Sequence, residues 1–425
     1  MRTLLLAFLL AACPSSPDPR MITGGGVGDG AIDGTVNVYV IDTETYAPIA
    51  DATVEVAGKD QQTDSTGLAV FSDVNGPQTL AIKAAGYRGA IWQGANGANL
   101  TIPVTKLGTI AAQHATLSGE VANWSAVTVA PGHLKVAVVS YSQTDSFGDP
   151  ENNLKTPSNG NVCVGALATC SFSVVARTGA VTLTAAIVDV DTHGTADASD
   201  DTLSVIGWAK SPSVQVDAGI DQTGLTLTQL AANQLQTVTI AYATPPSALT
   251  KHDAVVGIEL SKDEIVQLPV LPSGATMALM PVPTAFVSGA TYRLSALART
   301  PAGDAGDQSV TIQRGQTSTA LAAERWLEAP TGLAATRTSA SVNVVAMAKL
   351  HTITWSDPNG KVLDATLFDA KQLTVTVPSL LALPQTGTLT ATAQGIGADF
   401  DLGNFSLDTD TRLVWGASNA AATIN

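Results

Sequence analysis

Charged residues are scarce in this chain of 425 residues, and basic residues are the scarcest. Only 13% of the residues are charged, and 21 Lys and Arg stand against 36 Asp and Glu, which gives a net charge of −15. Phosphate backbones and anionic lipid surfaces repel so acidic a protein, which argues against nucleic acid as a partner. The surplus of carboxylates is compatible with cation binding and with solubility outside the cell.

Signature motifs of catalysis are missing as well. The sequence contains no His-Glu-x-x-His, no Gly-x-Ser-x-Gly, no Gly-x-x-x-x-Gly-Lys-[Ser/Thr] and no cysteine in a catalytic context. Glu259 and Glu264 flank an apolar strand and could imitate the carboxylate pair of a glycosidase, but on a strand surface we expect them to be solvated. We therefore predict no catalytic residues and a protein that is not an enzyme, with an envelope hydrolase as the least favoured alternative.

The longest apolar run lies at the N-terminus and is too short to span a bilayer, which takes about 20 residues. Met1-Arg2-Thr3 precedes Leu4-Leu5-Leu6-Ala7-Phe8-Leu9-Leu10-Ala11-Ala12 and then Cys13. One basic residue, a short apolar run and small residues before a cysteine are typical of an export signal. The alternative, a true start at Met21, requires the upstream residues to match this order by chance.

Leu10-Ala11-Ala12-Cys13 resembles the lipobox of bacterial lipoproteins. The resemblance implies that residues 1–12 are a signal peptide, that Cys13 is diacylated on sulfur and acylated on its new amino group, and that membrane lipid is a partner through Cys13. Each buried methylene contributes about 0.8 kcal/mol, so several acyl chains should hold the protein at a membrane persistently. In such lipoproteins Asp after the cysteine favours the inner membrane. Here Pro14 follows, so we expect the outer membrane, with a periplasmic or a surface-facing orientation left open.

Residues 13–33 are rich in proline and then in glycine, and we expect them to form a flexible tether. The remaining length is too great for one ordinary core and predicts several domains. Alternating apolar and polar residues predict strands at 35–41, 52–56 and 100–104. Thr63 to Gly67 is typical of an Asx-type turn in which the glycine takes a positive φ.

The segment 34–107 resembles the carboxypeptidase regulatory-like domain, a transthyretin-like β-sandwich. Three landmarks occur in order, Pro48-Ile49-Ala50-Asp51-Ala52-Thr53-Val54, Thr63 to Gly67, and Ala85-Gly86-Tyr87. The resemblance implies a folding or spacer module without catalytic residues. We expect the Tyr87 ring to pack on the end of the sandwich with its hydroxyl hydrogen-bonded.

Further strand patterns predict three more β-sandwiches, at 108–230, 231–328 and 329–425, the last weakly similar to a fibronectin type III domain. The predicted fold class is therefore all-β, with tandem Ig-like or transthyretin-like sandwiches after the signal peptide and tether. Each sandwich core takes about one tryptophan, so the six tryptophans are expected in cores, although some could be sugar-stacking platforms.

Cys163 and Cys170 are the two cysteines left after Cys13, and an exported protein tolerates disulfides. A disulfide between them would close a small loop and stabilise the fold by roughly 2.5 kcal/mol. The alternative, a redox-active pair, lacks the Cys-x-x-Cys spacing. We predict a structural disulfide.

An Asp-rich stretch follows a predicted strand and has the spacing of an EF-hand calcium loop. Its predicted ligands are Asp189, Asp191, the Thr195 carbonyl, Asp197 and Asp200. Two features depart from that loop, because His193 stands at its fifth position and Asp rather than Glu stands at its twelfth. The sequence predicts a weak, structural Ca²⁺ site, and the alternative is a solvated hairpin turn without an ion.

Taken together, these patterns predict a non-catalytic, lipid-anchored protein of the cell envelope or surface with a structural or binding role. The alternative is a calcium-dependent adhesin that binds carbohydrate or protein. A surface glycan or an envelope protein is the expected partner, and no cofactor other than Ca²⁺ is expected.

Overall fold

The computed structural model describes residues 31–43, 45–107, 114–144, 161–164, 168–197, 199–261, 264–268, 277–368, 373–399 and 413–424. Cys13 and the signal peptide lie outside the described residues, as does most of the predicted tether. The described chain forms two compact units, one ending at Thr105 and one that begins at Lys106 and includes 413–424. In the described residues only strands and short 3-10 turns occur, which confirms the predicted all-β class. Among them, no helix is long and apolar enough to cross a membrane.

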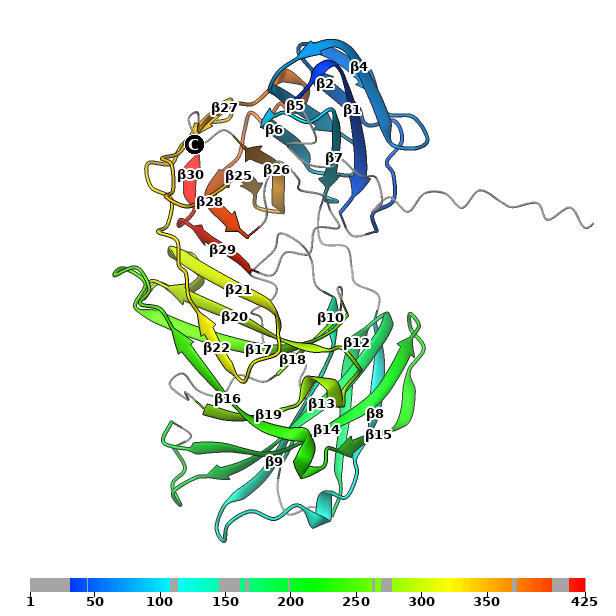
Figure 1. Ribbon diagram of the computed structural model, residues 1–425, viewed down its shortest axis with the longest axis vertical. Coiled ribbons are helices and arrows are strands. Elements are labelled where there is room, and N and C mark those ends of the chain that lie inside the picture. The colour runs from blue at the N-terminus through cyan, green and yellow to red at the C-terminus, as the bar shows by residue number, and fades with distance from the viewer. Residues whose placement is uncertain are drawn as a thin grey trace, which may run out of the picture. The chain divides into compact units, whose positions relative to one another are not determined.

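The first unit contains two sheets, with strand orders β4-β1-β7 and β6-β5-β2-β3 (Figure 1). Strand β1 carries an alternating pattern in which Val36, Val38 and Val40 are fully buried. Such alternation is what a strand with one face on a core requires. The seven strands are β1 Asp33–Asp42, β2 Thr53–Val56, β3 Lys59–Gln62, β4 Leu68–Asn75, β5 Gln78–Lys83, β6 Gly89–Ala95 and β7 Asn99–Val104.

The predicted turn after Thr63 is confirmed. The Asp64 carboxylate accepts the Thr66 hydroxyl at 2.6 Å, the Leu68 amide at 3.1 Å and the Thr66 amide at 2.8 Å, and these bonds, the hydroxyl's first, lower the pKa of Asp64. Gly67 has φ +75°, and a Cβ there would lie 2.7 Å from the Val40 carbonyl oxygen. Only glycine therefore fits both the backbone angle and the space.

The turn landmark contacts the landmark that begins at Pro48, and the Tyr87 landmark contacts strand β1. The buried Thr63 hydroxyl donates to the Ile49 carbonyl at 2.7 Å and accepts the Ala52 amide at 2.9 Å. The Tyr87 hydroxyl donates to the buried Asp42 carboxylate at 2.9 Å, as predicted for that hydroxyl. Residues separated by 11 to 45 positions thus fix the entry and exit of strands in this unit.

The second unit begins with a seven-stranded sheet of order β11-β9-β13-β14-β15-β8-β12. A disulfide joins Cys163 of β11 to Cys170 of β12, which confirms the predicted pair. It therefore links the two strands at the ends of the sheet order. The strands are β8 His114–Val121, β9 Leu134–Tyr141, β11 Asn161–Val164, β12 Cys170–Arg177, β13 Gly179–Asp191, β14 Thr202–Val216 and β15 Gln222–Gln229.

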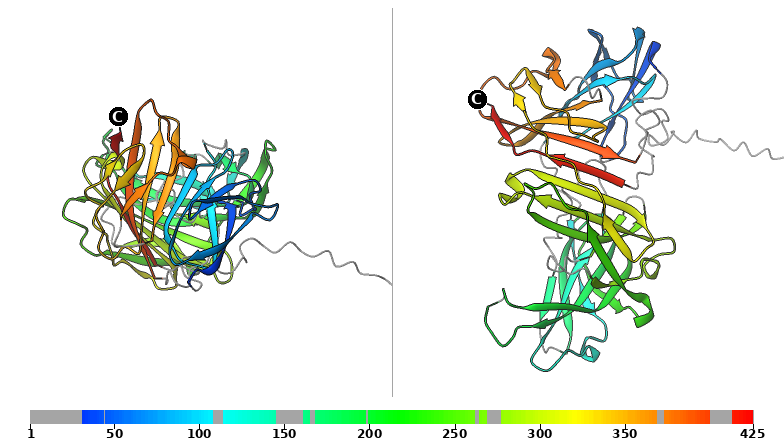
Figure 2. Two further views of the ribbon diagram at one scale, coloured as in Figure 1. Left: turned by 90° about the horizontal axis from the view of Figure 1, so that it is seen from above. Right: turned by 60° about the vertical axis from the view of Figure 1, so that its left-hand side comes forward.

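The rest of the second unit is organised around a sheet of order β10-β18-β17-β20-β21-β29-β28-β25-β26. Strand β29 pairs antiparallel with β21 on one side and with β28 on the other, and Figure 2 shows the red β29 beside the yellow β21. The bounds are β10 Gln143–Thr144, β17 Lys251–Ser261, β18 Glu264–Gln267, β20 Thr291–Arg299, β21 Gln308–Gln316, β25 Leu350–Asp357, β26 Gly360–Leu367, β28 Leu389–Ala398 and β29 Leu413–Ser418.

Smaller elements complete this unit. Two three-stranded sheets have the orders β19-β16-β22 and β23-β24-β27, and β30 pairs with β28. These strands are β16 Leu235–Tyr242, β19 Met277–Pro281, β22 Ala320–Ala323, β23 Ala334–Ala335, β24 Ser339–Ser341, β27 Thr374–Thr376 and β30 Ala422–Ile424. The 3-10 turns are η2 Trp124–Ala126, η3 Ala232–Gln234, η4 Pro283–Ala285, η5 Gly303–Ala305 and η6 Ser379–Leu381.

One hydrophobic core crosses two of the predicted sandwiches. Ala186, Val188 and Trp208 from the seven-stranded sheet share a buried cluster with Ile258 and Leu294 of the next segment. The Trp208 indole donates to the Leu279 carbonyl at 2.9 Å. The described residues of 108–230, 231–328 and 329–425 fall in one compact unit, which this core and the sheet continued through β29 help to join, and the sandwich boundaries within it stay a prediction.

Candidate functional site

The Asp-rich stretch forms the tip of the β13–β14 hairpin. Asp189 and Asp191 belong to the end of β13 and pair in register with Ser204 and Thr202 of β14. Asp197 and Asp200 follow in the loop. The hairpin therefore places the predicted ligands at one end of the seven-stranded sheet.

Two histidines that are far apart in sequence meet these carboxylates. The Asp189 Oδ1 atom lies 2.7 Å from His133 Nδ1. The Asp191 Oδ2 atom lies 3.2 Å from His193 Nδ1 and 3.6 Å from His133 Nε2. His133 is on the loop before β9, and no local sequence signal marks it, because its partner is 56 residues away.

The loop carboxylates have protein partners of their own. The Thr195 hydroxyl donates to Asp200 at 2.9 Å. Hydrogen bonds from Ser199, first from its side chain and then from its amide at 3.0 Å, lower the pKa of Asp197. In the described part of the chain, no group of three or more His, Cys, Asp or Glu is arranged to hold a metal ion. The calcium site stays a prediction.

Glu259 is not solvated, so that expectation is wrong. Its side chain is 9% exposed, and its carboxylate accepts Arg314 Nε at 2.6 Å and the Gly315 amide at 2.9 Å. Glu264 instead accepts the Ser142 hydroxyl at 2.6 Å. The sequence could not show this, because Arg314 lies on β21, two strands away in the sheet and 55 residues along the chain.

Most tryptophans lie in cores, as expected. Trp92 is half-buried, and the other five are at most 8% exposed: Trp124, Trp208, Trp326, Trp355 and Trp415. Three of these indoles donate to backbone carbonyls of their own unit, namely those of Trp208, Trp326 and Trp355. A sugar-stacking platform needs an exposed ring face, which these five side chains do not offer.

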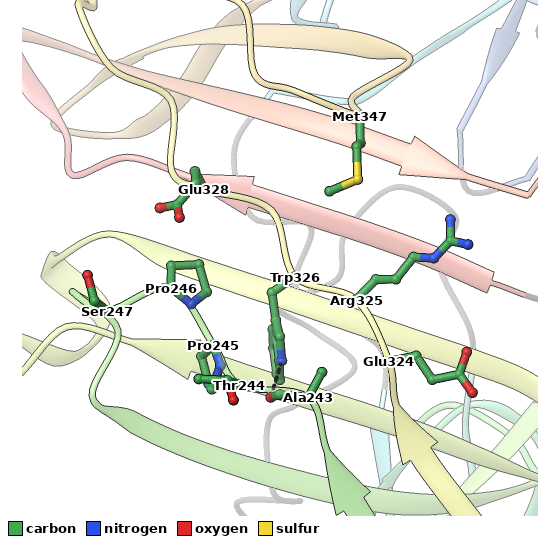
Figure 3. Close-up of a pocket in the computed structure, with 10 residues that line it drawn as sticks. All are labelled: Ala243, Thr244, Pro245, Pro246, Ser247, Glu324, Arg325, Trp326, Glu328 and Met347. Carbon is green, nitrogen blue, oxygen red and sulfur yellow. Dashed lines mark hydrogen bonds between the residues drawn. The ribbon is translucent and has the colours of Figure 1, made fainter.

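A cavity of about 750 Å³ lies in the second unit (Figure 3). One wall is the segment after β16, with Pro245 and Pro246, and another is the segment after β22, with Trp326. The Trp326 indole donates to the Ala243 carbonyl at 2.9 Å, which fastens the two walls together. Met347, from the segment between β24 and β25, lies across from Trp326 in Figure 3.

Polar groups line the edge of this cavity. Glu324 and Glu328 are exposed and lie on opposite sides of Trp326 (Figure 3). The Arg325 guanidinium stands 5.1 Å from the centre of the Trp415 ring, a distance typical of a cation–π contact. Sequence reasoning missed this cavity, since its walls come from three separate segments and carry no motif.

The chain matches no protein-family model and no curated protein. Solved structures give distant likenesses. The FN1–FN3 domains of chicken CNTN1 are 10% identical, with 75% of this chain and 96% of that chain covered and a TM-score of 0.17. Two B repeat units of the collagen binding protein of Staphylococcus aureus are 10% identical, with 92% and 98% covered and a TM-score of 0.14.

BcpA, the major pilin subunit of Bacillus cereus, is 9% identical, with 68% of this chain and 98% of that chain covered and a TM-score of 0.15. Scores this low do not establish a shared fold for the whole chain. The description of this protein therefore rests on its own strands, sheets and cores.

Proposed function

We propose that this chain is a non-catalytic, lipid-anchored protein of the cell envelope with a structural or binding role. The observation that carries the structural role is the continuity of the second unit, where one core joins the first two of its predicted sandwiches and a sheet continues through β29 into the third. Close-packed interiors have low compressibility and transmit strain. A body of this kind holds its ends at a fixed separation better than domains on linkers.

The anchor rests on Leu10-Ala11-Ala12-Cys13 and on the Pro- and Gly-rich residues after it. Several acyl chains at Cys13 would hold the protein at the outer membrane, and the tether would separate the folded units from the lipid. Within this proposal the first unit is a spacer of the carboxypeptidase regulatory-like kind. The hydrogen bonds of Thr63 to Ile49 and Ala52, and of Tyr87 to Asp42, support that assignment.

The anchor is tested by replacing the proposed acylation site. In bacteria that express the full chain, Cys13→Ser should move the protein from the detergent phase to the aqueous phase of a detergent-partition assay. Ser15→Ala, two residues away, is the matched control and should stay in the detergent phase. Pro14→Asp should keep the lipid and shift the protein toward the inner membrane. Unchanged partition of Cys13→Ser would refute the anchor.

A further inference from the structure

The cavity beside Trp326 has the size of a small-molecule site. Its volume of about 750 Å³ falls within the usual range for ligand pockets. Its walls are held by an internal hydrogen bond between the Trp326 indole and the Ala243 carbonyl. This bond fixes the position of the Trp326 ring in the wall.

The part of the cavity wall made by two prolines and a tryptophan offers no free hydrogen-bond donor, and the exposed hydroxyls of Thr244 and Ser247 lie beside it. Pro245 and Pro246 have no amide hydrogens, and the one N–H of the Trp326 indole is already used. Met347 adds an apolar thioether side chain that is 61% exposed. Its backbone has φ +66°, a conformation that residues other than glycine adopt rarely and that tends to occur at functional sites.

The charges around the cavity favour a cation. Glu324 and Glu328 contribute two exposed carboxylates. Arg325, the one basic residue of the lining, directs its guanidinium toward the Trp415 ring. Carboxylates are acceptors only, so a ligand that donates hydrogen bonds and carries positive charge complements this edge.

A neutral sugar fits the same cavity less well. Sugars stack their C–H faces on exposed aromatic rings, but Trp326 is only 8% exposed. An aliphatic stem needs no such face and can lie against proline rings and a methionine side chain.

We propose that this cavity binds an organic cation, an ammonium or guanidinium group on an aliphatic stem. The stem contacts Pro245, Pro246 and Met347, and a cationic group is held at Glu324 or at Glu328, which lie on opposite sides of Trp326. This inference deepens the binding role of the proposed function and does not depend on the lipid anchor. A failed titration would leave the partition result of Cys13→Ser unchanged, so the two failures are distinguishable.

The test is calorimetric titration of the full chain, purified in detergent, with 1,8-diaminooctane and with 1,8-octanediol, which has the same stem and no charge. We expect saturable one-to-one binding of the diamine and none of the diol. Glu328→Gln and Glu324→Gln should each weaken diamine binding about tenfold, because hydrogen bonds to charged groups contribute strongly to affinity. Glu120→Gln, an exposed change on β8, is the matched control for the overall negative charge and should have no effect.

Two further ligands identify the source of the cation: spermidine represents a free polyamine, and a trilysine peptide represents the lysine side chains of a protein. The natural source should be the one whose representative binds more tightly. Three results would overturn the proposal: no saturable diamine binding, equal binding of diamine and diol, or equal weakening by Glu120→Gln and Glu328→Gln. Binding of maltotriose in place of the diamine would also overturn it and would assign the cavity to a glycan.

Discussion

Both compact units have cores made of strands, but the contacts that hold the strands together differ between the two units. The first unit uses seven strands in two sheets, and its contacts are fixed by residues such as Thr63 and Tyr87 that lie between β1 and β7 in the chain. The second unit joins three predicted sandwiches through Trp208 and β29. Local turn chemistry therefore defines the first unit, and long-range pairing defines the second.

The largest expected effect is the loss of stability when a buried aromatic side chain is removed from the core of one unit. Trp208→Ala should destabilise the second unit by about 3–5 kcal/mol, as removal of a buried aromatic side chain does, and leave the first unit unchanged. Phe71→Ala, at a fully buried position of β4, should do the reverse. Denaturant unfolding followed by limited proteolysis and mass spectrometry measures both. Equal loss of both units in either variant would contradict this prediction.

The pH dependence of the free energy of unfolding should also differ between the units, because the first unit has no histidine and the second contains all five. Burial lowers the pKa of His351 below its ordinary 6.5, and His351 Nε2 accepts the Val345 amide at 3.0 Å. The unfolded chain then binds a proton that the folded chain resists, so the second unit should lose stability as the pH falls below 6.5.

Unfolding of His351→Gln at a series of pH values measures this contribution. The variant should show a flatter decline below pH 6.5 than the unmodified protein, whereas His252→Gln, at an exposed position, should show the original slope. A slope unchanged by His351→Gln would mean that other groups account for the decline.

The smallest expected effect concerns the β13–β14 hairpin. If the Asp-rich loop binds Ca²⁺, millimolar calcium should raise the melting temperature of the second unit and not that of the first. Asp191→Ala should abolish the rise, and Asp217→Ala, at an acidic turn of the same unit, should preserve it. Equal melting temperatures with and without calcium would leave the loop as a plain turn whose carboxylates are satisfied by His133, His193 and its own hydroxyls.

Much of the fold could be predicted from periodicity and turn chemistry. The alternation in β1, the Gly67 turn and the Cys163–Cys170 disulfide are all visible locally in the sequence. Strand β3 could not be found this way, because all four of its residues, Lys59–Gln62, are exposed and polar. Its strand conformation comes from pairing with β2.

Features that depend on distant partners were beyond sequence reasoning. Glu259 is buried against Arg314, with which it forms an ion pair, and Asp189 contacts the imidazole of His133. The cavity beside Trp326 combines three segments that each resemble an ordinary loop. None of these pairings has a periodicity or a spacing that a single sequence displays.

The most direct test of the account is hydrogen exchange of the full chain at increasing urea, followed by mass spectrometry. Peptides from 114–229 and from 235–323 should lose protection at one urea concentration, because they share the core around Trp208. Peptides from 33–104 should lose protection at another. Separate transitions for 114–229 and 235–323 would contradict a continuous second unit and, with it, the proposed structural role.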